Sequence, residues 1–316
     1  MQYRAGMLVS GKSRRHSLAS FRAQQRKCMI YYYNPVIDQD LILSIDNIIL
    51  DVSITRPERV DLLNQMIASM ASNSKVSVQT WQGSGAGAFR NQTLIRLDAE
   101  RSFWIGQGLI GNGTLLDRVR LDFNPNKVGD DPNFKIIREF LVRNSRANLC
   151  RITRFDLAID VPVPREKCCL VKDRRLYIER RHGEEYTQYL GSKSSKVGRV
   201  KLYNKTLESK LDYPLTRLEL TLSPDIPFEN INFPTVYCVN EACNHYQNAR
   251  LTDTQRFIVN AVLQGYGMLN DLCRKTRAKI EGVLKENQRV VSISQDSYNA
   301  ILEQLKEYLK PSIIVS

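Results

Sequence analysis

The sequence predicts an α+β fold: a large, mostly antiparallel sheet with helices packed on its apolar face, followed by a helical C-terminal region. Four stretches predict the sheet, because each alternates apolar with polar residues at the two-residue period of a strand. They span residues 118 to 124, 153 to 160, 199 to 205 and 216 to 222. Other stretches carry apolar residues at helical spacing, and these predict the helices.

Along the chain, the first expected element is a long strand from residue 40 to 54. Pro57 then opens a helix over residues 58 to 72, since proline is favoured in the first turn of a helix. The glycine-rich stretch from 83 to 92 lacks the Gly-Lys-Ser/Thr ending of a phosphate loop, so we expect a flexible hairpin connection there. Strands are also expected at 75 to 81, 93 to 98, 101 to 106 and 117 to 124, and a helix at 133 to 144.

The pattern changes after residue 224. Pro227, Pro234 and clustered asparagines interrupt any regular period, which indicates a domain boundary. The rest of the chain has helical periodicity. Helices are expected at 252 to 267, 270 to 287 and 295 to 310.

The four alternating stretches have one apolar and one polar face. The polar face combines carboxylates, a tyrosine and several cations that could converge on one side of the sheet. An ordinary half-solvated sheet with mixed charge is the alternative. The residues on the polar face are Arg120, Asp122, Asn124, Arg154, Asp156, Asp160, Lys201, Tyr203, Lys205, Arg217 and Glu219.

The charge of the chain favours a polyanionic partner. Its 316 residues have a net charge of +13, and residues 1 to 37 contain Lys and Arg but no Asp or Glu. We expect residues 1 to 37 to be a flexible arm that contacts phosphates, with an organellar transit peptide as the alternative. The longest apolar runs are too short and too interrupted to cross a bilayer, so a cytoplasmic protein without a membrane partner is expected.

Residues 168 to 182 place many cations between strand-like residues. Cations hold phosphates and an aromatic ring such as that of Tyr177 can stack on an unpaired base, so this segment is interpreted as a DNA-facing ribbon. A solvated edge strand, charged to prevent edge-to-edge pairing, is the alternative. The ribbon's candidate phosphate contacts are Arg174, Arg175, Arg180 and Arg181.

Three motifs occur in a recognisable order: FNPNK at 123 to 127, TRFDLAID at 153 to 160, and KLYNKTLE at 201 to 208, followed by RLEL. In this order they resemble the Rep_trans family of rolling-circle plasmid replication initiators and related conjugative-element relaxases, over about residues 44 to 222. The resemblance implies that Tyr203 is the nucleophile that nicks one DNA strand. It also implies action as a dimer and recruitment of a host helicase. Asp122 departs from the pattern, because a glutamate is expected there.

The chemistry of nicking adds roles for the neighbours of Tyr203. A phenol with an ordinary pKa of about 10 needs help at neutral pH, from a cation, a base or a metal. Lys205 lies two residues away and could lower the phenol pKa or stabilise charge on the phosphorane. No paired His-hydrophobe-His motif is present, so a carboxylate site for Mg²⁺ or Mn²⁺ is expected. Its candidate ligands are Asp156, Asp160, Glu219 and Asp122.

Ion pairing is the alternative for two of these carboxylates. Asp156 and Asp160 could instead form salt bridges to Arg154 and Arg217 at the strand ends. Tyr203, likewise, could contact DNA without reacting.

The sequence therefore predicts a replication initiator that binds a double-stranded origin, nicks one strand and forms a 5′-phosphotyrosine link. A conjugative relaxase, a filamentous-phage initiator and a non-catalytic DNA-binding regulator are the alternatives. The expected partners are origin DNA, a host helicase and polymerase, and a second copy of the chain. The expected regions are the arm (1 to 37), a nicking domain (38 to 224) and a helical origin-recognition region (225 to 316). Arg120, Arg154, Lys201 and Arg217 are the expected DNA contacts of the sheet.

Overall fold

The computed structural model confirms the α+β fold class. It describes residues 29–34, 39–111, 115–146, 149–183, 185–192, 198–238, 251–263, 269–287 and 293–311. Within this part of the chain lies an 11-stranded sheet whose pairings are all antiparallel. Its strands are β1 Met29–Asn34, β2 Gln39–Ser53, β3 Ser77–Gln82, β4 Phe89–Arg96, β5 Ser102–Ile110, β6 Leu115–Phe123, β7 Arg151–Val161, β9 Tyr177–His182, β10 Glu185–Leu190, β11 Arg199–Asn204 and β12 Thr216–Leu222.

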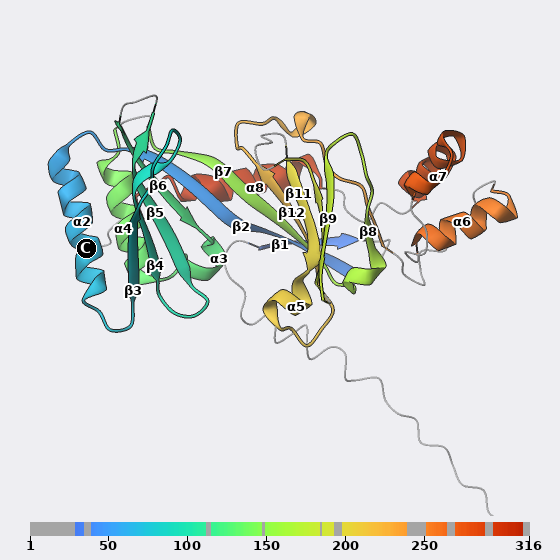
Figure 1. Ribbon diagram of the computed structural model, residues 1–316, viewed down its shortest axis with the longest axis horizontal. Helices are drawn as coiled ribbons and strands as arrows, with labels where there is room; N and C mark the ends of the chain where they lie inside the picture. Colours follow the sequence, from blue (N-terminus) through green and yellow to red (C-terminus); the bar gives the residue numbers. More distant parts are fainter. Residues whose placement is uncertain are drawn as a thin grey trace, which may run out of the picture.

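The long strands β2 and β7 join two lobes of this sheet (Figure 1). The strand order is β3-β4-β5-β6-β2-β7-β12-β11-β10-β9, with β1 beside β2. Residues 39 to 44 of β2 pair with β1, and residues 48 to 53 pair with β6. Strand β2 therefore spans both lobes and fixes the position of one against the other.

Three helices cover the apolar face of the sheet: α2 Pro57–Ala71, α4 Pro132–Asn144 and α8 Gln295–Glu307. Helix α2 has a proline in its first turn, where proline is favoured. Helix α4 is capped by the side chain of Asp131, which accepts a hydrogen bond from the backbone N–H of Asn133 at 2.9 Å. Their buried residues Leu63, Ile137 and Ile301 join the core formed by the sheet. The predicted apolar face is thus the face that the helices cover.

The C-terminal part does not form one accessory region, which corrects the expected boundary. Helix α8 packs on the main core through Tyr298 and Ile301. The helices α6 Asp253–Leu263 and α7 Arg274–Asn287 have a small core of their own, which includes Val171. The remaining short elements are α3 Pro125–Val128, α5 Lys205–Ser209, η1 Arg165–Lys167, β8 Cys168–Leu170, η2 Phe228–Asn230, β13 Val236–Cys238 and η4 Leu269–Asp271.

The expected arm is also shorter than predicted. Residues 29 to 34, MIYYYN, form strand β1 and pair with β2 rather than continuing the arm. Aromatic and β-branched residues favour strands, and this signal outweighs the basic composition before it. Residues 1 to 28 and 35 to 38 lie outside the described residues.

A β-bulge in β2 changes which side chains lie on the polar face of the sheet. The pairing of β2 with β7 shifts between Ile45 and Asn47, so Asp46 is the extra residue. Ile45 and Ile48 both point into the core, and Asp46 and Asn47 both reach polar partners on the other side. The bulge thereby adds a carboxylate to the polar face.

No helix among the described residues is long and apolar enough to cross a membrane.

Candidate active site around Tyr203

Antiparallel pairing places Tyr203 beside the charged residues of two further strands. In the register of β11, β12 and β7, Tyr203 lies opposite Arg217, and Arg217 lies opposite Asp160. Two positions along the same ladder, and therefore on the same face, Lys201 lies opposite Glu219. The predicted convergence on one face is therefore correct for these five residues.

The hydroxyl of Tyr203 lies between two carboxylates. It is 2.5 Å from Glu219 Oε1 and 3.2 Å from Glu208 Oε2. Because a phenol has a single proton to donate, the shorter contact identifies Glu219 as its acceptor. The ring is buried, with 5% of the residue exposed. Burial, with the charge of Glu219 as the next cause, raises the pKa of Tyr203 far above its usual value, so the phenol is protonated at neutral pH.

Glu219 has the properties of a base for this phenol. Burial raises its pKa, and the ammonium of Lys201, 3.6 Å from Glu219 Oε2, offsets part of this rise. A carboxylate with a raised pKa holds a proton more tightly than an ordinary glutamate does, which suits it to receive one from a neighbouring nucleophile.

Two lysines stand next to the tyrosine ring. Lys201 Nζ is 3.6 Å from the ring centroid, and Lys205 Nζ is 6.0 Å from it. Lys205 is the first residue of α5 rather than part of the strand, because the side chain of Asn204 caps this helix by accepting from the N–H of Leu207 at 3.1 Å. These ammonium groups could stabilise negative charge on a phosphate brought to the phenol.

Glu208, which the sequence analysis did not select, covers the phenol from α5. Its carboxylate accepts a hydrogen bond from Lys205, and its side chain is 46% exposed. Burial is the largest single effect and opposes its ionisation. The hydrogen bond from Lys205 and the positive charges of Lys205, Lys201 and Arg217 together outweigh burial and keep the pKa of Glu208 below its usual range. Glu208 is thus an anion at the position where a phosphate would meet both Tyr203 and Lys205.

Arg217 donates three hydrogen bonds to two carboxylates, so its guanidinium group is already engaged within the protein. Its Nε and Nη2 donate to the two oxygens of Asp160 at 2.6 and 2.7 Å. Its Nη1 donates to Asp46 Oδ1 at 2.8 Å, so the extra residue of the β-bulge supplies the second carboxylate that binds Arg217. A break in the alternation of LILSIDNIIL, with polar residues at both 46 and 47, is the sequence signal that could have revealed Asp46.

The FNPNK turn holds this bulge in place. Asn124 Nδ2 donates to Asp46 Oδ1 at 3.1 Å, and Asn126 Nδ2 donates to the carbonyl of Ile45 at 2.7 Å. The motif therefore supports Arg217 through Asp46, a role that its sequence did not reveal.

The four predicted metal ligands do not meet at one place. Asp156 lies four residues from Asp160 on β7, about 13 Å along the strand. Asp122 lies close to Asp156 rather than to Asp160, and it accepts a hydrogen bond from Asn47 at 2.9 Å. Burial raises the pKa of Asp122, and the nearby charge of Asp156 adds to the rise. Only Glu219 and Asp160 lie near Tyr203.

Both ion pairs of the alternative interpretation are present. Arg217 binds Asp160 with two hydrogen bonds, and Arg154 Nη2 lies 3.5 Å from Asp156 Oδ2.

The carboxylates around Tyr203 do not fit a divalent cation as they stand, because Glu219, Asp160 and Asp46 already accept from Tyr203 or from Lys and Arg side chains. Among the described residues, no group of three or more His, Cys, Asp or Glu could hold a metal ion. Among the carboxylate oxygens of the described residues, Asp156 Oδ1 is buried without a hydrogen-bond partner.

The arginines predicted to bind DNA fall into two groups. Arg120 binds Asp51 with bonds of 2.6 and 2.8 Å, and Arg175 binds Asp173 and the carbonyl of Asn232, so these arginines, like Arg217, support the fold. The other arginines have side chains that reach the surface. They are Arg154, Arg174, Arg180 and Arg181.

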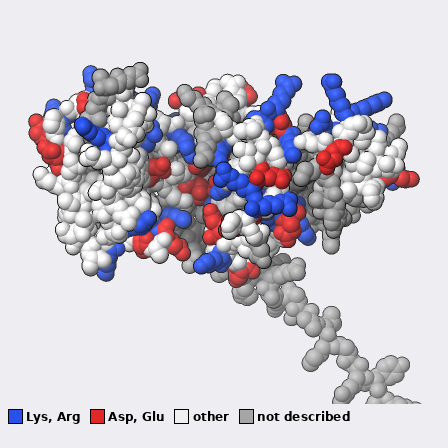
Figure 2. Space-filling view, in the orientation of Figure 1, with Lys and Arg blue, Asp and Glu red and all other residues white. Residues whose placement is uncertain are grey.

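The ribbon does not present its cations on one side. Arg180 pairs in register with Thr187, and Arg181 pairs with Tyr186, so the two arginines lie on opposite faces of the sheet. Tyr177 and Tyr186 share the face of Arg181, and both donate to Glu179. Arg180 lies on the face of Tyr203. Figure 2 shows Lys and Arg gathered over the middle and right of one side of the molecule, with Asp and Glu among them.

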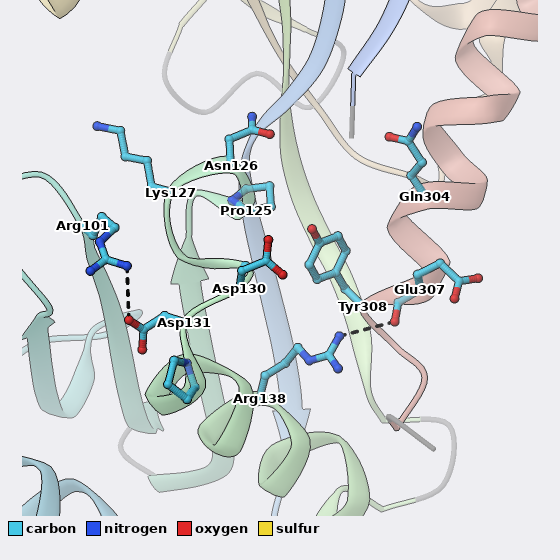
Figure 3. Close-up of a pocket in the computed structure, with 12 residues that line it drawn as sticks. Arg101, Pro125, Asn126, Lys127, Asp130, Asp131, Arg138, Gln304, Glu307 and Tyr308 are labelled. Atoms are coloured by element: carbon cyan, nitrogen blue, oxygen red, sulfur yellow. Dashed lines mark hydrogen bonds and ion pairs between the residues drawn. The ribbon is translucent and has the colours of Figure 1, made fainter. Parts of the chain in front are cut away.

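A cavity of about 570 Å³ lies behind the FNPNK turn, between α3, the start of α4 and the end of α8 (Figure 3). Two of its charged groups bind other residues of the lining: Arg101 lies 3.3 Å from Asp131, and Arg138 donates to the carbonyl of Glu307 at 3.5 Å. Asn126 lines the cavity and also holds the bulge. The cavity therefore adjoins the support of Arg217 rather than the phenol.

Comparison with known proteins gives little beyond this geometry. No family model matches the chain, and no curated protein matches it. A solved structure of the rolling circle replication initiator protein from Geobacillus stearothermophilus aligns with a TM-score of 0.35 and 12% sequence identity, over 85% of this chain and 97% of that one. A likeness this slight assigns neither a function nor a site residue to this chain.

Proposed function

We propose that the chain is a DNA strand-nicking and strand-transfer enzyme that initiates rolling-circle replication, with Tyr203 as the nucleophile. The observation that carries the proposal is the contact of the Tyr203 hydroxyl with Glu219 at 2.5 Å, beside Lys201 and Lys205. A nucleophile bonded to a base and flanked by cations is the arrangement that phosphoryl transfer requires.

In the proposed reaction, Glu219 takes the proton of Tyr203 as the phenol oxygen attacks the scissile phosphorus. A bond forms between the tyrosine oxygen and phosphorus, and the bond from phosphorus to the 3′ oxygen breaks. The leaving oxygen takes a proton from water and becomes a free 3′-hydroxyl. The phosphoester energy stays in the 5′-phosphotyrosine link, so the step can be reversed to rejoin a strand.

Glu208 must move before the phosphate can enter. Its carboxylate stands 3.2 Å from the phenol and holds Lys205 in an ion pair. An arriving phosphate would replace this carboxylate as the partner of Lys205. Helix α5 therefore supplies both a cation for the substrate and an anion that occupies the site without it.

The involvement of Mg²⁺ or Mn²⁺ remains part of the proposal, with a changed location. Asp156 and Asp122 are the carboxylates that would hold the ion, because Asp156 Oδ1 is buried without a hydrogen-bond partner. These two carboxylates are an incomplete ligand set, and Asp156 lies about 13 Å along β7 from Asp160, so no step of the proposed reaction at Tyr203 passes through the ion. Double-stranded origin DNA, a host helicase and polymerase, and a second copy of the chain are the proposed partners on the motif resemblance alone.

The test uses supercoiled DNA that carries the replication origin of the genetic element encoding the chain. The wild type should convert it to open circles and form a covalent adduct, and peptide mapping should place the DNA on Tyr203. Tyr203→Phe should bind the same DNA and leave it uncut. An adduct on Tyr203→Phe would mean that another tyrosine reacts, and Tyr189, which faces the same side, would be examined first. Binding without any adduct from the wild type would favour a regulator.

A further inference from the structure

Tyr189 lies on the same face of the sheet as Tyr203, one strand away. Strand β10 was not predicted from the sequence. In its register, Tyr189 lies opposite Lys201 on one side and opposite Ile178 on the other. Since Tyr203 is two residues from Lys201, the rings of Tyr189 and Tyr203 belong to diagonal neighbours, about 7–8 Å apart between their α-carbons.

The ring of Tyr189 is flanked by two guanidinium groups. The central guanidinium carbon of Arg199 lies 4.8 Å from the ring centroid, and that of Arg180 lies 5.7 Å from it. The ring is partly exposed, and the neighbouring Ile178 is 38% exposed. Tyr177 and Tyr186 use their hydroxyls to bind Glu179, whereas no hydrogen bond of the Tyr189 hydroxyl is found within the described part of the chain.

An aromatic ring between cations, open to solvent and beside an apolar side chain, suits single-stranded DNA. An unpaired base of any sequence can stack on the ring by taking the place of one of the guanidinium groups that lie over it, and the arginines can then bind the phosphates on either side of that base. Lys201 continues this line of cations from Tyr189 to the phenol of Tyr203.

We propose that Tyr189, with Arg180 and Arg199, forms a stacking site for an unpaired base within one or two nucleotides of the phosphate that Tyr203 attacks. This inference rests on the proposed function for its position relative to the nick. The role is that of a substrate-binding site: the base is held so that the strand backbone runs past Lys201 toward Tyr203.

The first experiment measures binding and does not depend on cutting. Single-stranded oligonucleotides of about 12 nucleotides, with normal bases or with abasic residues throughout, are titrated against proteins that carry Tyr203→Phe. Adding Tyr189→Ala should weaken binding of the normal strand by roughly tenfold to a hundredfold and leave binding of the abasic strand almost unchanged. Tyr189→Phe, which keeps the ring, should bind like its parent.

The matched control is Trp81→Ala on strand β3 at the far end of the sheet, an aromatic residue that is 43% exposed. It should change neither titration. Equal losses for normal and abasic strands with Tyr189→Ala would overturn the stacking site, because a lost charge or a distorted fold does not depend on the bases.

The second experiment locates the base. With Tyr203 intact, single abasic residues are placed at each position around the mapped nick, and adduct formation is measured for wild type and Tyr189→Ala. An abasic residue at one position next to the nick should slow adduct formation by the wild type. The same abasic residue should not slow adduct formation by Tyr189→Ala any further. Loss of the adduct in Tyr189→Phe would instead make Tyr189 the nucleophile and overturn the inference. If no protein forms an adduct, the proposed function fails, and the binding titration still decides whether Tyr189 stacks on bases.

Discussion

The hydroxyl of Tyr203 donates to the carboxylate of Glu219 across a diagonal of the ladder between β11 and β12, over 2.5 Å. Their direct partners in register are Arg217 and Lys201, respectively. The proposed nucleophile and its proposed base therefore each have a cation opposite them, which limits the energetic cost of burying a carboxylate here.

Replacing the base should separate activity from stability. Glu219→Gln keeps the shape and removes the carboxylate, so nicking should fall by about 10²–10⁴-fold, the usual contribution of a general base. Because burial raises the pKa of Glu219, the charged form destabilises the fold at neutral pH, and the variant should melt at the same temperature or higher. Adduct formation and thermal unfolding of the same samples check both parts. A variant that nicks at the wild-type rate would contradict the assignment of the base.

The pH dependence of nicking follows from the same shift. In the proposed reaction the base must be ionised Glu219, so the rate of nicking should fall as the pH falls through a pKa above the ordinary glutamate range. For stability the sign is opposite. A group whose pKa is higher in the folded state than in the unfolded state adds to the free energy of unfolding. This stabilisation is fully present below the unfolded-state pKa and is lost as the pH rises through the folded-state pKa. The unfolding free energy of wild type minus that of Glu219→Gln should therefore decrease with rising pH in denaturant titrations. A difference that does not change with pH would mean that the pKa of Glu219 is not shifted.

Removing the carboxylate that occupies the phosphate position should favour substrate entry. In Glu208→Gln, Lys205 loses its anionic partner and the phenol loses a neighbouring charge, so DNA should bind more tightly and the adduct should form faster at low DNA concentration. Initial rates over a DNA titration measure this effect. Glu303→Gln removes an exposed carboxylate from α8 and serves as the control. Slower nicking by Glu208→Gln, with Glu303→Gln unchanged, would instead give Glu208 a positive role in the reaction.

The two aspartates of TRFDLAID should behave differently although the motif presents them alike. Asp160→Asn removes the carboxylate that binds the buried Arg217 with two hydrogen bonds, and breaking a buried ion pair costs about 3–5 kcal/mol of stability. Asp156→Asn removes a weaker contact of 3.5 Å and should cost much less. If a divalent cation binds at Asp156 and Asp122, Asp156→Asn should raise the Mg²⁺ concentration needed for nicking, while Asp160→Asn should lower the melting temperature. Urea unfolding and a Mg²⁺ titration separate these effects, and an unchanged metal requirement in Asp156→Asn would remove that site.

The two-residue period of the sequence was sufficient to place Tyr203, Lys201, Arg217 and Glu219 on one face. Alternation specifies the face of a strand, and antiparallel order then brings these rows together. It could not show how far apart the carboxylates lie along the strands, because that distance depends on register. Asp156 and Asp160 share a face and are still about 13 Å apart.

Other parts of the site depend on local backbone geometry that a periodic pattern does not contain. Asp46 reaches the site through a bulge, and Glu208 reaches it because Asn204 ends the strand and starts a helix. The sequence pattern did not indicate a binding role for Tyr189, because its strand β10 follows a short turn and pairs with β9 in a hairpin that was not predicted. Charge alone also could not show that Arg175 and Arg120 are paired with carboxylates that the fold brings near them; their contact with DNA stays a prediction.

The last prediction concerns the choice of DNA sequence, which the motif resemblance places outside the nicking sheet. Removing all residues after 251 cannot test this, because α8 packs on the main core and its loss would expose Tyr298 and Ile301. Helix α7 can be changed without that damage. Replacing its exposed Arg274, Lys275 and Lys279 by Gln should lower affinity for origin DNA more than for scrambled DNA, since a basic helix can enter a major groove and contact bases.

The control variant replaces three exposed lysines elsewhere, Lys135, Lys306 and Lys310, by Gln. Each triple variant loses the same charge, so each should reduce the dependence of affinity on salt to a similar extent wherever the residues contact phosphates. Only the α7 variant should lose discrimination between origin and scrambled DNA. Binding titrations on both DNAs at two salt concentrations decide the matter. Equal losses on origin and scrambled DNA would show that α7 contacts phosphates alone, and the reading of sequence would then have to be sought in another part of the chain.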